Sequence, residues 1–268
     1  MPFTLDSIQD LPAVLARRDA ANAAAIPVYP CRAAIPYGPG TAETFDLYPA
    51  RSATGPVPVQ IFVHGGFWSM MRAAQFAFLA PGFVPFGAAL VVIDYPLIPN
   101  VRMADIVASC ARAVTFLHSH AAEFGIDPAR IYVSGNSAGG HLVAELMDGP
   151  ASFAIKGGTA ISGLYDLTPV AASFRNEVLG FTPAEVAAFS PQLRPSGIKV
   201  PLIMTVGGDE TGEFLRQTAM FADHARAGGA PVDHMVVAGT NHITVVLDAF
   251  ANPAVPLNQA VRRQMGLA

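Results

Sequence analysis

The chain has 268 residues and a formal net charge of −4, and no run of basic residues occurs in it. We therefore expect no nucleic-acid partner. Hydrophobic residues make up 52% of the chain and charged residues 13%, a composition that requires a large core. A homo-oligomer is one way to cover the apolar surface that remains.

The N-terminal extension, residues 1–36, is rich in Ala and Pro and is predicted to hold a short helix near Leu11 to Arg18. Its first ten residues, MPFTLDSIQD, lack the basic start and the apolar centre of a signal peptide. We therefore expect a cytoplasmic protein. The whole chain, 1–268, is predicted to form one α/β domain.

Strands and helices alternate along the rest of the chain. The predicted strands are continuously apolar, which is typical of a parallel sheet covered by helices on both faces. Strands are predicted over residues 44–48, 58–63, 88–93, 130–134, 155–161, 202–207 and 232–238. Helices are predicted within 73–83 and over 103–124, 138–147 and 212–228, with a final helix at the C-terminal end.

Two segments depart from this alternation. Ala73 to Ile93 is 21 residues long and has no charge, but its prolines and glycines favour a helix followed by a core strand over a membrane span. Residues 164–199 are rich in proline and are predicted to form short helices in a small cap. No membrane association is expected.

The motif Gly135 to Gly140, GNSAGG, directly follows the apolar run Ile131 to Val133. A strand, a G-x-S-x-G sequence and a helix start together are typical of a nucleophile elbow, in which a serine lies on a sharp strand-to-helix turn. The flanking glycines allow the strand and the helix to approach closely. The pattern predicts Ser137 as a catalytic nucleophile.

A serine nucleophile needs backbone amides that stabilise the oxyanion of the tetrahedral intermediate. One amide comes from the residue after the serine, here Ala138. The sequence HGGFW at residues 64–68 follows an earlier predicted strand and resembles the loop that supplies the second amide. Gly66 and Phe67 are therefore the candidate donors, and His64 is expected to shape this loop.

The general base and its orienting acid should follow the serine along the chain. His242 lies in a loop after the last predicted strand, where this architecture presents the base. Asp209 and Glu210 follow the preceding strand, and either carboxylate is able to orient the imidazole of His242. Asp166 is a more distant third candidate, and chemistry alone does not choose among these acids.

These motifs together resemble the kynurenine formamidase (arylformamidase) branch of the α/β-hydrolases. The similarity runs from about Tyr37 to the loop after His242 and is carried by HGGFW, GNSAGGHL (135–142), SGLYDLTPV (162–170), GGDETGEFLRQ (207–217) and GTNH (239–242). In that family the acid lies three residues before a Glu-Phe pair, which implies Glu210 as the orienting acid. The family more often has Tyr at position 67 and His at position 136, where this chain has Phe67 and Asn136.

The sequence therefore predicts an α/β-hydrolase fold and a cofactor-free serine hydrolase that forms an acyl-enzyme. The expected substrates are small esters or N-formyl arylamides, with kynurenine formamidase proper and plain carboxylesterase as alternatives. A non-catalytic receptor on the same fold is an alternative of another class. The substrate pocket is predicted to be apolar, compact and lined by Trp68, Asn136 and Tyr165.

No metal site and no cofactor are expected. The two cysteines, Cys31 and Cys110, lie far apart and form no metal or redox motif. Reduced thiols are the default expectation, and a disulfide between the two is the alternative. No G-x-G-x-x-G motif follows an early strand, which argues against a dinucleotide.

Overall fold

The computed structural model describes residues 3, 5, 8–51 and 54–267. Positions 1–2, 4 and 6–7 of the N-terminal extension lie outside the described residues. The described part contains an eight-stranded sheet with the order β1-β2-β4-β3-β5-β6-β7-β8. The strands are β1 (Arg32–Pro36), β2 (Thr44–Tyr48), β3 (Val57–Val63), β4 (Ala89–Ile93), β5 (Ile126–Asn136), β6 (Ile155–Ile161), β7 (Leu202–Gly207) and β8 (Val232–Val237).

The sheet is parallel from β4 to β8 in this order, and only the pairs β1–β2 and β2–β4 are antiparallel. Eight α-helices accompany the sheet in the described residues: α1 (Leu11–Ala25), α2 (Met103–Ser119), α3 (Ala138–Asp148), α4 (Thr168–Ala171), α5 (Asn176–Leu179), α6 (Pro183–Ala188), α7 (Gly212–Ala227) and α8 (Pro256–Gln264). Short 3₁₀ segments and one π-helical segment complete the elements: η1 (Ala73–Gln75), η2 (Ala77–Gly82), η3 (Val84–Phe86), η4 (Ala121–Phe124), η5 (Ser152–Ala154), η6 (Pro191–Leu193) and the π-helical η7 (Val245–Phe250). This architecture is the predicted α/β-hydrolase fold.

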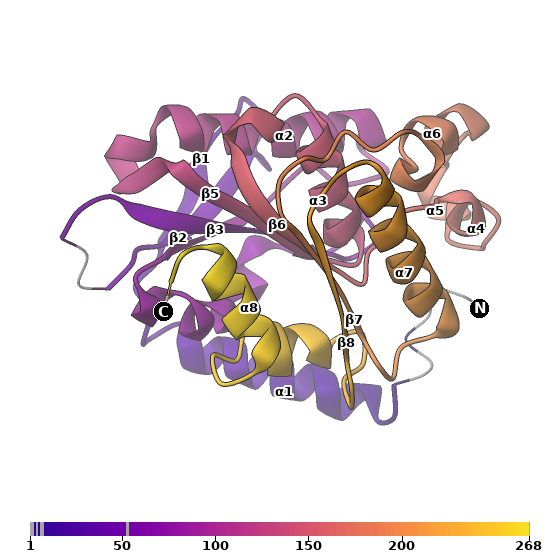
Figure 1. The fold of residues 1–268 in the computed structure, drawn as a ribbon. Helices are drawn as coiled ribbons and strands as arrows, with labels where there is room; N and C mark the ends of the chain where they lie inside the picture. The colour runs from indigo at the N-terminus through magenta and orange to yellow at the C-terminus, as the bar shows by residue number, and fades with distance from the viewer. Residues whose placement is uncertain (1–2, 4, 6–7, 52–53, 268) are drawn as a thin grey trace.

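Two buried clusters, one on each face of the sheet, form the core. Val59, Ile61 and Val63 of β3 pack with α2, α3 and α7, whereas Phe62 packs with η2, η7 and α8 on the opposite face. Both faces of central strands such as β3 and β4 are therefore buried, which explains their apolar sequences, whereas β1 and β8 at the edges are partly exposed. Figure 1 shows the same layers, with α2 and α3 on one side of the sheet and α1 and α8 on the other.

The structure differs from the sequence prediction in three elements. β1, which the sequence pattern does not predict, pairs with β2 at the edge of the sheet. The helix expected within residues 73–83 is a series of 3₁₀ turns, with Pro81 inside η2. α1 extends to Ala25, well beyond the predicted end at Arg18.

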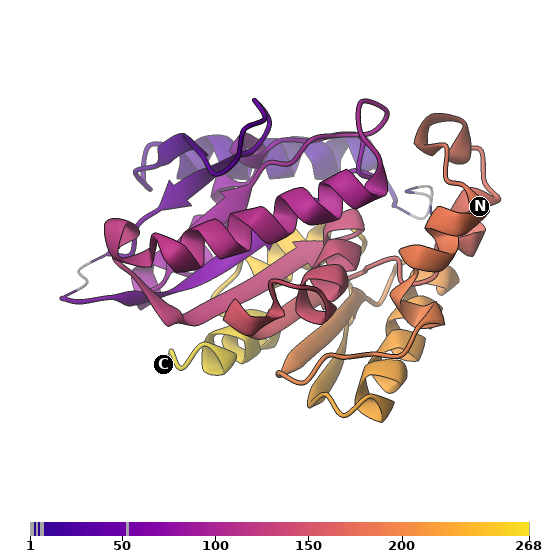
Figure 2. The same ribbon diagram turned by 90° about the horizontal axis from the view of Figure 1, so that it is seen from above.

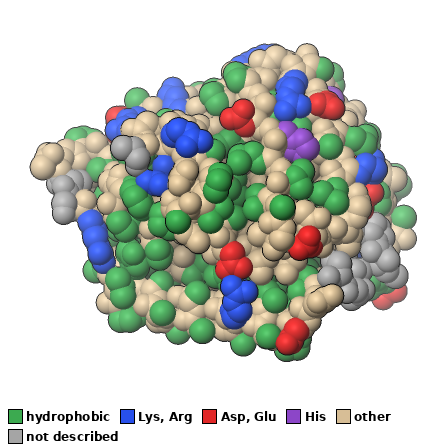
Figure 3. Space-filling view, turned by 60° about the horizontal axis from the view of Figure 1, so that its bottom comes forward, with side chains coloured by type: hydrophobic (Ala, Val, Ile, Leu, Met, Phe, Trp, Pro, Cys, Tyr) green, Lys and Arg blue, Asp and Glu red, His purple; other side chains and the backbone are tan. Residues whose placement is uncertain are grey.

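Apolar side chains also reach the surface. Figure 3 shows them spread over the face that carries α1 and α8, with charged groups scattered between them. None of the helices in the described part of the chain is both long and apolar enough to cross a membrane.

Because β3 and β5 to β8 run parallel, their carboxyl ends lie at the same edge of the sheet. The HGGFW loop follows β3, Ser137 follows β5, and Glu210 and His242 follow β7 and β8. The segment 164–199 holds the short helices α4 to α6, which lie with α7 at one end of the molecule (Figure 2). The topology thus places the predicted catalytic residues at one edge of the sheet.

Candidate active site

Ser137 lies on a strained turn between β5 and α3. Its backbone has φ 59° and ψ −122°, a conformation that non-glycine residues rarely adopt, and its amide donates to the Ile161 carbonyl at 2.9 Å. A Cβ at Gly139 would overlap the Val63 carbonyl oxygen, so α3 approaches β3 more closely than any other residue would allow. The geometry is that of a nucleophile elbow.

The HGGFW loop packs directly on this elbow. A Cβ on Gly65 would lie 2.8 Å from the Asn136 carbonyl oxygen and 3.2 Å from the Ser137 Cβ. Gly66, Phe67 and Trp68 follow with φ of 95°, 48° and 54°, so the chain turns sharply beside the serine. The Gly66 carbonyl accepts the amides of residues 69 and 70 within the loop, each at 3.0 Å. Gly66 and Phe67 line the same cavity as Ser137, and Ala138 is the next residue after the serine.

His242, which is partly exposed, pairs with the buried Glu210. The His242 Nδ1 donates to Glu210 Oε2 at 2.6 Å, and no part of the Glu210 side chain is exposed. The other carboxylate oxygen, Oε1, accepts Ser162 Oγ at 2.5 Å and the Gly207 amide at 2.7 Å. Asp209, the alternative acid, is exposed and is held through its backbone amide, which donates to the Thr240 carbonyl. Of the two adjacent carboxylates, Glu210 is therefore the one that contacts the histidine.

Two residues that sequence reasoning missed support this pair. Ser162 follows β6, is fully buried and has a left-handed backbone, φ 50°, which directs its hydroxyl to Glu210. Phe214 of α7 stacks on the His242 ring, with 4.2 Å between the ring centroids. Both residues lie in motifs of the formamidase resemblance, 162–170 and 207–217, but the motifs do not show these roles, which depend on which strand ends lie side by side.

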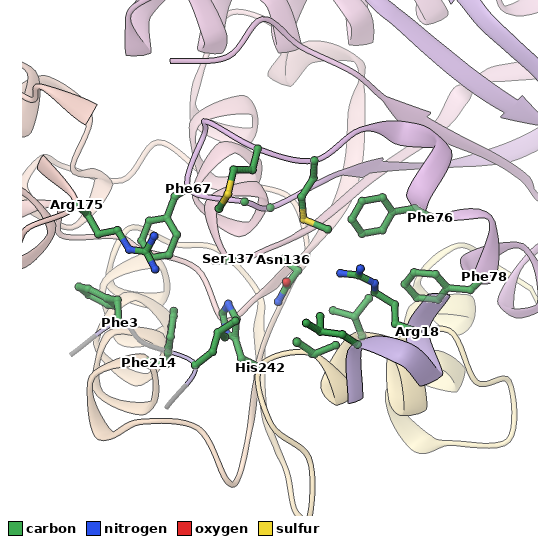
Figure 4. A pocket seen from close by; sticks show the side chains of 18 residues that line it. Phe3, Arg18, Phe67, Phe76, Phe78, Asn136, Ser137, Arg175, Phe214 and His242 are labelled. Atoms are coloured by element: carbon green, nitrogen blue, oxygen red, sulfur yellow. The ribbon is translucent and has the colours of Figure 1, made fainter. Parts of the chain in front are cut away.

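Ser137 and His242 line one cavity of about 170 Å³ (Figure 4). Most of its wall is apolar or aromatic, and its residues come from the N-terminal segment, the HGGFW loop, the 3₁₀ turns and the C-terminal loops. The lining residues are Phe3, Leu5, Leu15, Arg18, Gly65, Gly66, Phe67, Met70, Met71, Phe76, Phe78, Asn136, Ser137, Arg175, Phe214, His242, Ile243 and Val246. Among the described residues of the predicted cap, 164–199, only Arg175 reaches this cavity.

The predicted pocket is partly wrong. Asn136 lines the cavity, but Trp68 and Tyr165 do not. Both are fully buried: the Trp68 ring packs edge-on against His141 and Phe181, and Tyr165 stacks on Phe221 at 4.3 Å. In the HGGFW loop it is Phe67 that lines the cavity, and the next side chain turns into the core. Four residues of the N-terminal segment that the sequence analysis did not place in the pocket also line the cavity: Phe3, Leu5, Leu15 and Arg18.

Two other histidines are structural. His64 donates from Nδ1 to the Gly65 carbonyl at 2.9 Å and stacks on Tyr95, so it shapes its own loop as expected. His141 is fully buried behind the elbow and donates from Nε2 to the Phe189 carbonyl at 2.8 Å. Burial lowers the pKa of His141 below its usual value.

The described residues contain no cluster of three or more His, Cys, Asp or Glu side chains with metal-binding geometry. Both cysteines are free: Cys31 is exposed and Cys110 is buried. Burial raises the pKa of the Cys110 thiol, which makes it an unreactive core residue.

Several known proteins are similar to this chain in sequence. The BD-FAE family model matches residues 45–152. Kynurenine formamidase of Danio rerio is 29% identical over 79% of this chain and 74% of its own length. An isoprenylcysteine alpha-carbonyl methylesterase of Arabidopsis thaliana is 25% identical over 81% of this chain and 57% of its own length.

Solved structures of other proteins also superpose on this chain. A putative thioesterase from Silicibacter sp. superposes with a TM-score of 0.81 and 29% identity, covering 94% of each chain. EstE1, a carboxylesterase cloned from a metagenomic library, superposes with a TM-score of 0.72 over 95% of each chain, and at 20% identity it supports the fold alone. The fold and these relatives define this chain as an α/β-hydrolase. More narrowly, the chain is similar to formamidases and esterases, and it is a hydrolase.

Proposed function

We propose that this hydrolase cleaves small carboxylic esters or N-formyl arylamides through an acyl-enzyme on Ser137. The single observation that carries the proposal is the His242–Glu210 hydrogen bond of 2.6 Å, beside a cavity that Ser137 and His242 both line. A serine on an elbow, a histidine oriented by a carboxylate and a glycine-rich loop are the parts that acyl transfer requires.

In the proposed mechanism, Ser137 Oγ attacks the carbonyl carbon of the substrate while His242 takes the hydroxyl proton. Because Nδ1 of His242 donates to Glu210, the lone pair that accepts this proton is on Nε2. The amides of Ala138, Gly66 and Phe67 stabilise the oxyanion. His242 then gives the proton to the leaving group, and water releases the acyl group by the same steps in reverse.

The size and chemistry of the cavity support small substrates. With about 170 Å³ and a largely aromatic wall, it suits a short acyl group and an aryl leaving group. We expect turnover of 4-nitrophenyl acetate and butyrate, with a steep fall beyond about six acyl carbons. N-formylkynurenine is the narrower candidate, because kynurenine formamidases of Danio rerio and Salmo salar are among the similar proteins. The expectations of a homo-oligomer and of a cytoplasmic location stay predictions.

The test is the loss of the nucleophile. Ser137→Ala should remove most turnover of 4-nitrophenyl acetate and all labelling by a fluorophosphonate, while its circular dichroism stays that of the wild type. Ser119→Ala, at the exposed end of α2, is the matched control and should keep both properties. Full activity in Ser137→Ala, or labelling of another serine, would overturn the proposal.

A further inference from the structure

An arginine without an ion-pair partner among the described residues lies at one end of the catalytic cavity. Arg175 precedes α5, lines the cavity and is half-buried. Its guanidinium lies over the Phe67 ring at 4.4 Å and over the Phe174 ring at 5.0 Å. In the described part of the chain, its buried Nε has no hydrogen-bond partner, and no carboxylate forms an ion pair with it.

The second arginine of the cavity differs in this respect. Arg18 donates from Nε and Nη2 to Asp19 Oδ1, at 3.0 and 2.7 Å, so its charge is already balanced. In Figure 4, Arg175 lies with Phe3, Phe67 and Phe214 on one side of Ser137 and His242, and Arg18 lies with Phe76 and Phe78 on the other. The cavity therefore has one end with an unbalanced positive charge.

Leaving a buried N–H without an acceptor is unfavourable, and the cost is larger when the group is charged. The two rings beside the guanidinium hold it in place but offer no acceptor oxygen. A planar guanidinium matches a carboxylate, which accepts two parallel hydrogen bonds from it. A substrate carboxylate would thus satisfy the one cationic group of the cavity that the described protein leaves unpaired.

We propose that Arg175 is a substrate-binding residue that selects esters or formamides carrying a carboxylate. The aromatic side chains around it would contact the body of the substrate, and the carboxylate would lie at the Arg175 end, away from the scissile carbonyl at Ser137. This inference rests on the proposed function, since it concerns the substrate of the same site. It assigns to the short cap a role in charge recognition.

The experiment compares matched pairs of substrates that differ only in charge. In one pair the carboxylate is on the leaving group: 4-acetoxybenzoate against 4-acetoxybenzamide. In the other it is on the acyl group: mono-4-nitrophenyl glutarate against the corresponding glutaramate, each corrected for uncatalysed hydrolysis. We expect the wild type to prefer the carboxylate in at least one pair, with kcat/KM higher by about tenfold to a hundredfold.

Arg175→Gln should bring that preference close to one and leave the uncharged member of the pair within about threefold of the wild type. Arg175→Lys keeps the charge but not the planar fork, and it should restore part of the preference. Arg32→Gln is the matched control, because Arg32 is an exposed arginine over an aromatic ring, Phe124, outside the cavity. It should behave as the wild type.

A wild-type preference near one in both pairs would overturn the inference, as would an equal loss on charged and uncharged substrates in Arg175→Gln. In either case, Ser137-dependent hydrolysis of 4-acetoxybenzamide would leave the proposed function standing. If the wild type hydrolyses neither member of either pair, the proposed function and this inference fail together.

Discussion

Replacing Glu210 by glutamine would change the chemistry of the proposed triad of Ser137, His242 and Glu210 while keeping its shape. In the wild type, Oε1 accepts two donors, the Ser162 hydroxyl and the Gly207 amide, and Oε2 accepts the His242 Nδ1–H. The backbone amide of Gly207 cannot become an acceptor, so the side-chain oxygen of the introduced glutamine must occupy the Oε1 position. The NH₂ group of the glutamine then faces His242.

This orientation forces His242 into the wrong tautomer. Facing an N–H donor, Nδ1 must act as the acceptor, so the ring proton moves to Nε2 and no lone pair is left to take the proton from Ser137. The analogous change in a Ser-His-Asp triad costs about 10⁴ in kcat. By the same logic we expect Glu210→Gln to lower kcat by about 10⁴, which corresponds to about 5.4 kcal/mol of transition-state stabilisation.

The assay is the steady-state hydrolysis of 4-nitrophenyl acetate by Glu210→Gln and by its neighbour control, Asp209→Asn. Asp209 is exposed and is held by its backbone amide, so its side-chain change should alter kcat by less than about threefold. A severe loss in Asp209→Asn with a mild one in Glu210→Gln would refute the assignment of the acid. A loss below about tenfold in Glu210→Gln would refute the tautomer argument itself.

Two further predictions concern stability. Gly139→Ala should lower the free energy of unfolding, measured in urea, by about 1–3 kcal/mol or more, because the new Cβ would overlap the Val63 carbonyl oxygen. Gly212→Ala is the control: it has open space at the start of a helix and should leave the free energy of unfolding unchanged. Burial lowers the pKa of His141, so the unfolded chain binds a proton there at higher pH than the folded chain does, and this contribution to stability is lost as pH falls below about 6.5. The free energy of unfolding in urea should therefore fall more between about pH 7.5 and about pH 5.5 for the wild type than for His141→Gln. Equal decreases in the two proteins would contradict the reasoning.

The parts of the molecule that are predictable from sequence are those with a local cause. The elbow requires small residues at Gly135 and Gly139, because there the strand and the helix are in backbone contact, and that requirement is visible in the sequence. The parallel sheet follows in the same way from runs of apolar residues that are buried on both faces. His242 is predictable because its place after the last strand is a property of chain order.

The acid needs more than local pattern. Asp209 and Glu210 are neighbours, and chemistry alone does not separate them. The structure separates them through two groups at the ends of neighbouring strands, Ser162 and Gly207, which hold the Glu210 carboxylate toward His242. No spacing rule along the chain reports that β6 and β7 end side by side.

The pocket is the least predictable part, for a related reason. Trp68 is the last residue of the HGGFW loop, and its position in the sequence therefore suggests a side chain in the pocket. At a sharp turn, however, a side chain is as free to face the core as the cavity. Here it faces the core. Part of the wall comes instead from Phe3, Leu5 and Leu15 of the N-terminal extension, more than 120 residues before Ser137 in the chain. Only the three-dimensional fold brings these residues to the cavity.

The proposed triad and the proposed specificity residue, Arg175, lie on different kinds of structure. Ser137, Glu210 and His242 follow the parallel strands β5, β7 and β8, and a change in the backbone position of β5 or β7 would disturb the core. Arg175 is half-buried and lies before the four-residue helix α5, outside the sheet, where substitutions cost less stability. Substitutions in this segment are thus able to change which substrates bind without moving the triad. For this reason the Arg175 substitutions should alter the preference between charged and uncharged substrates, whereas Glu210→Gln should lower the turnover of both to the same extent.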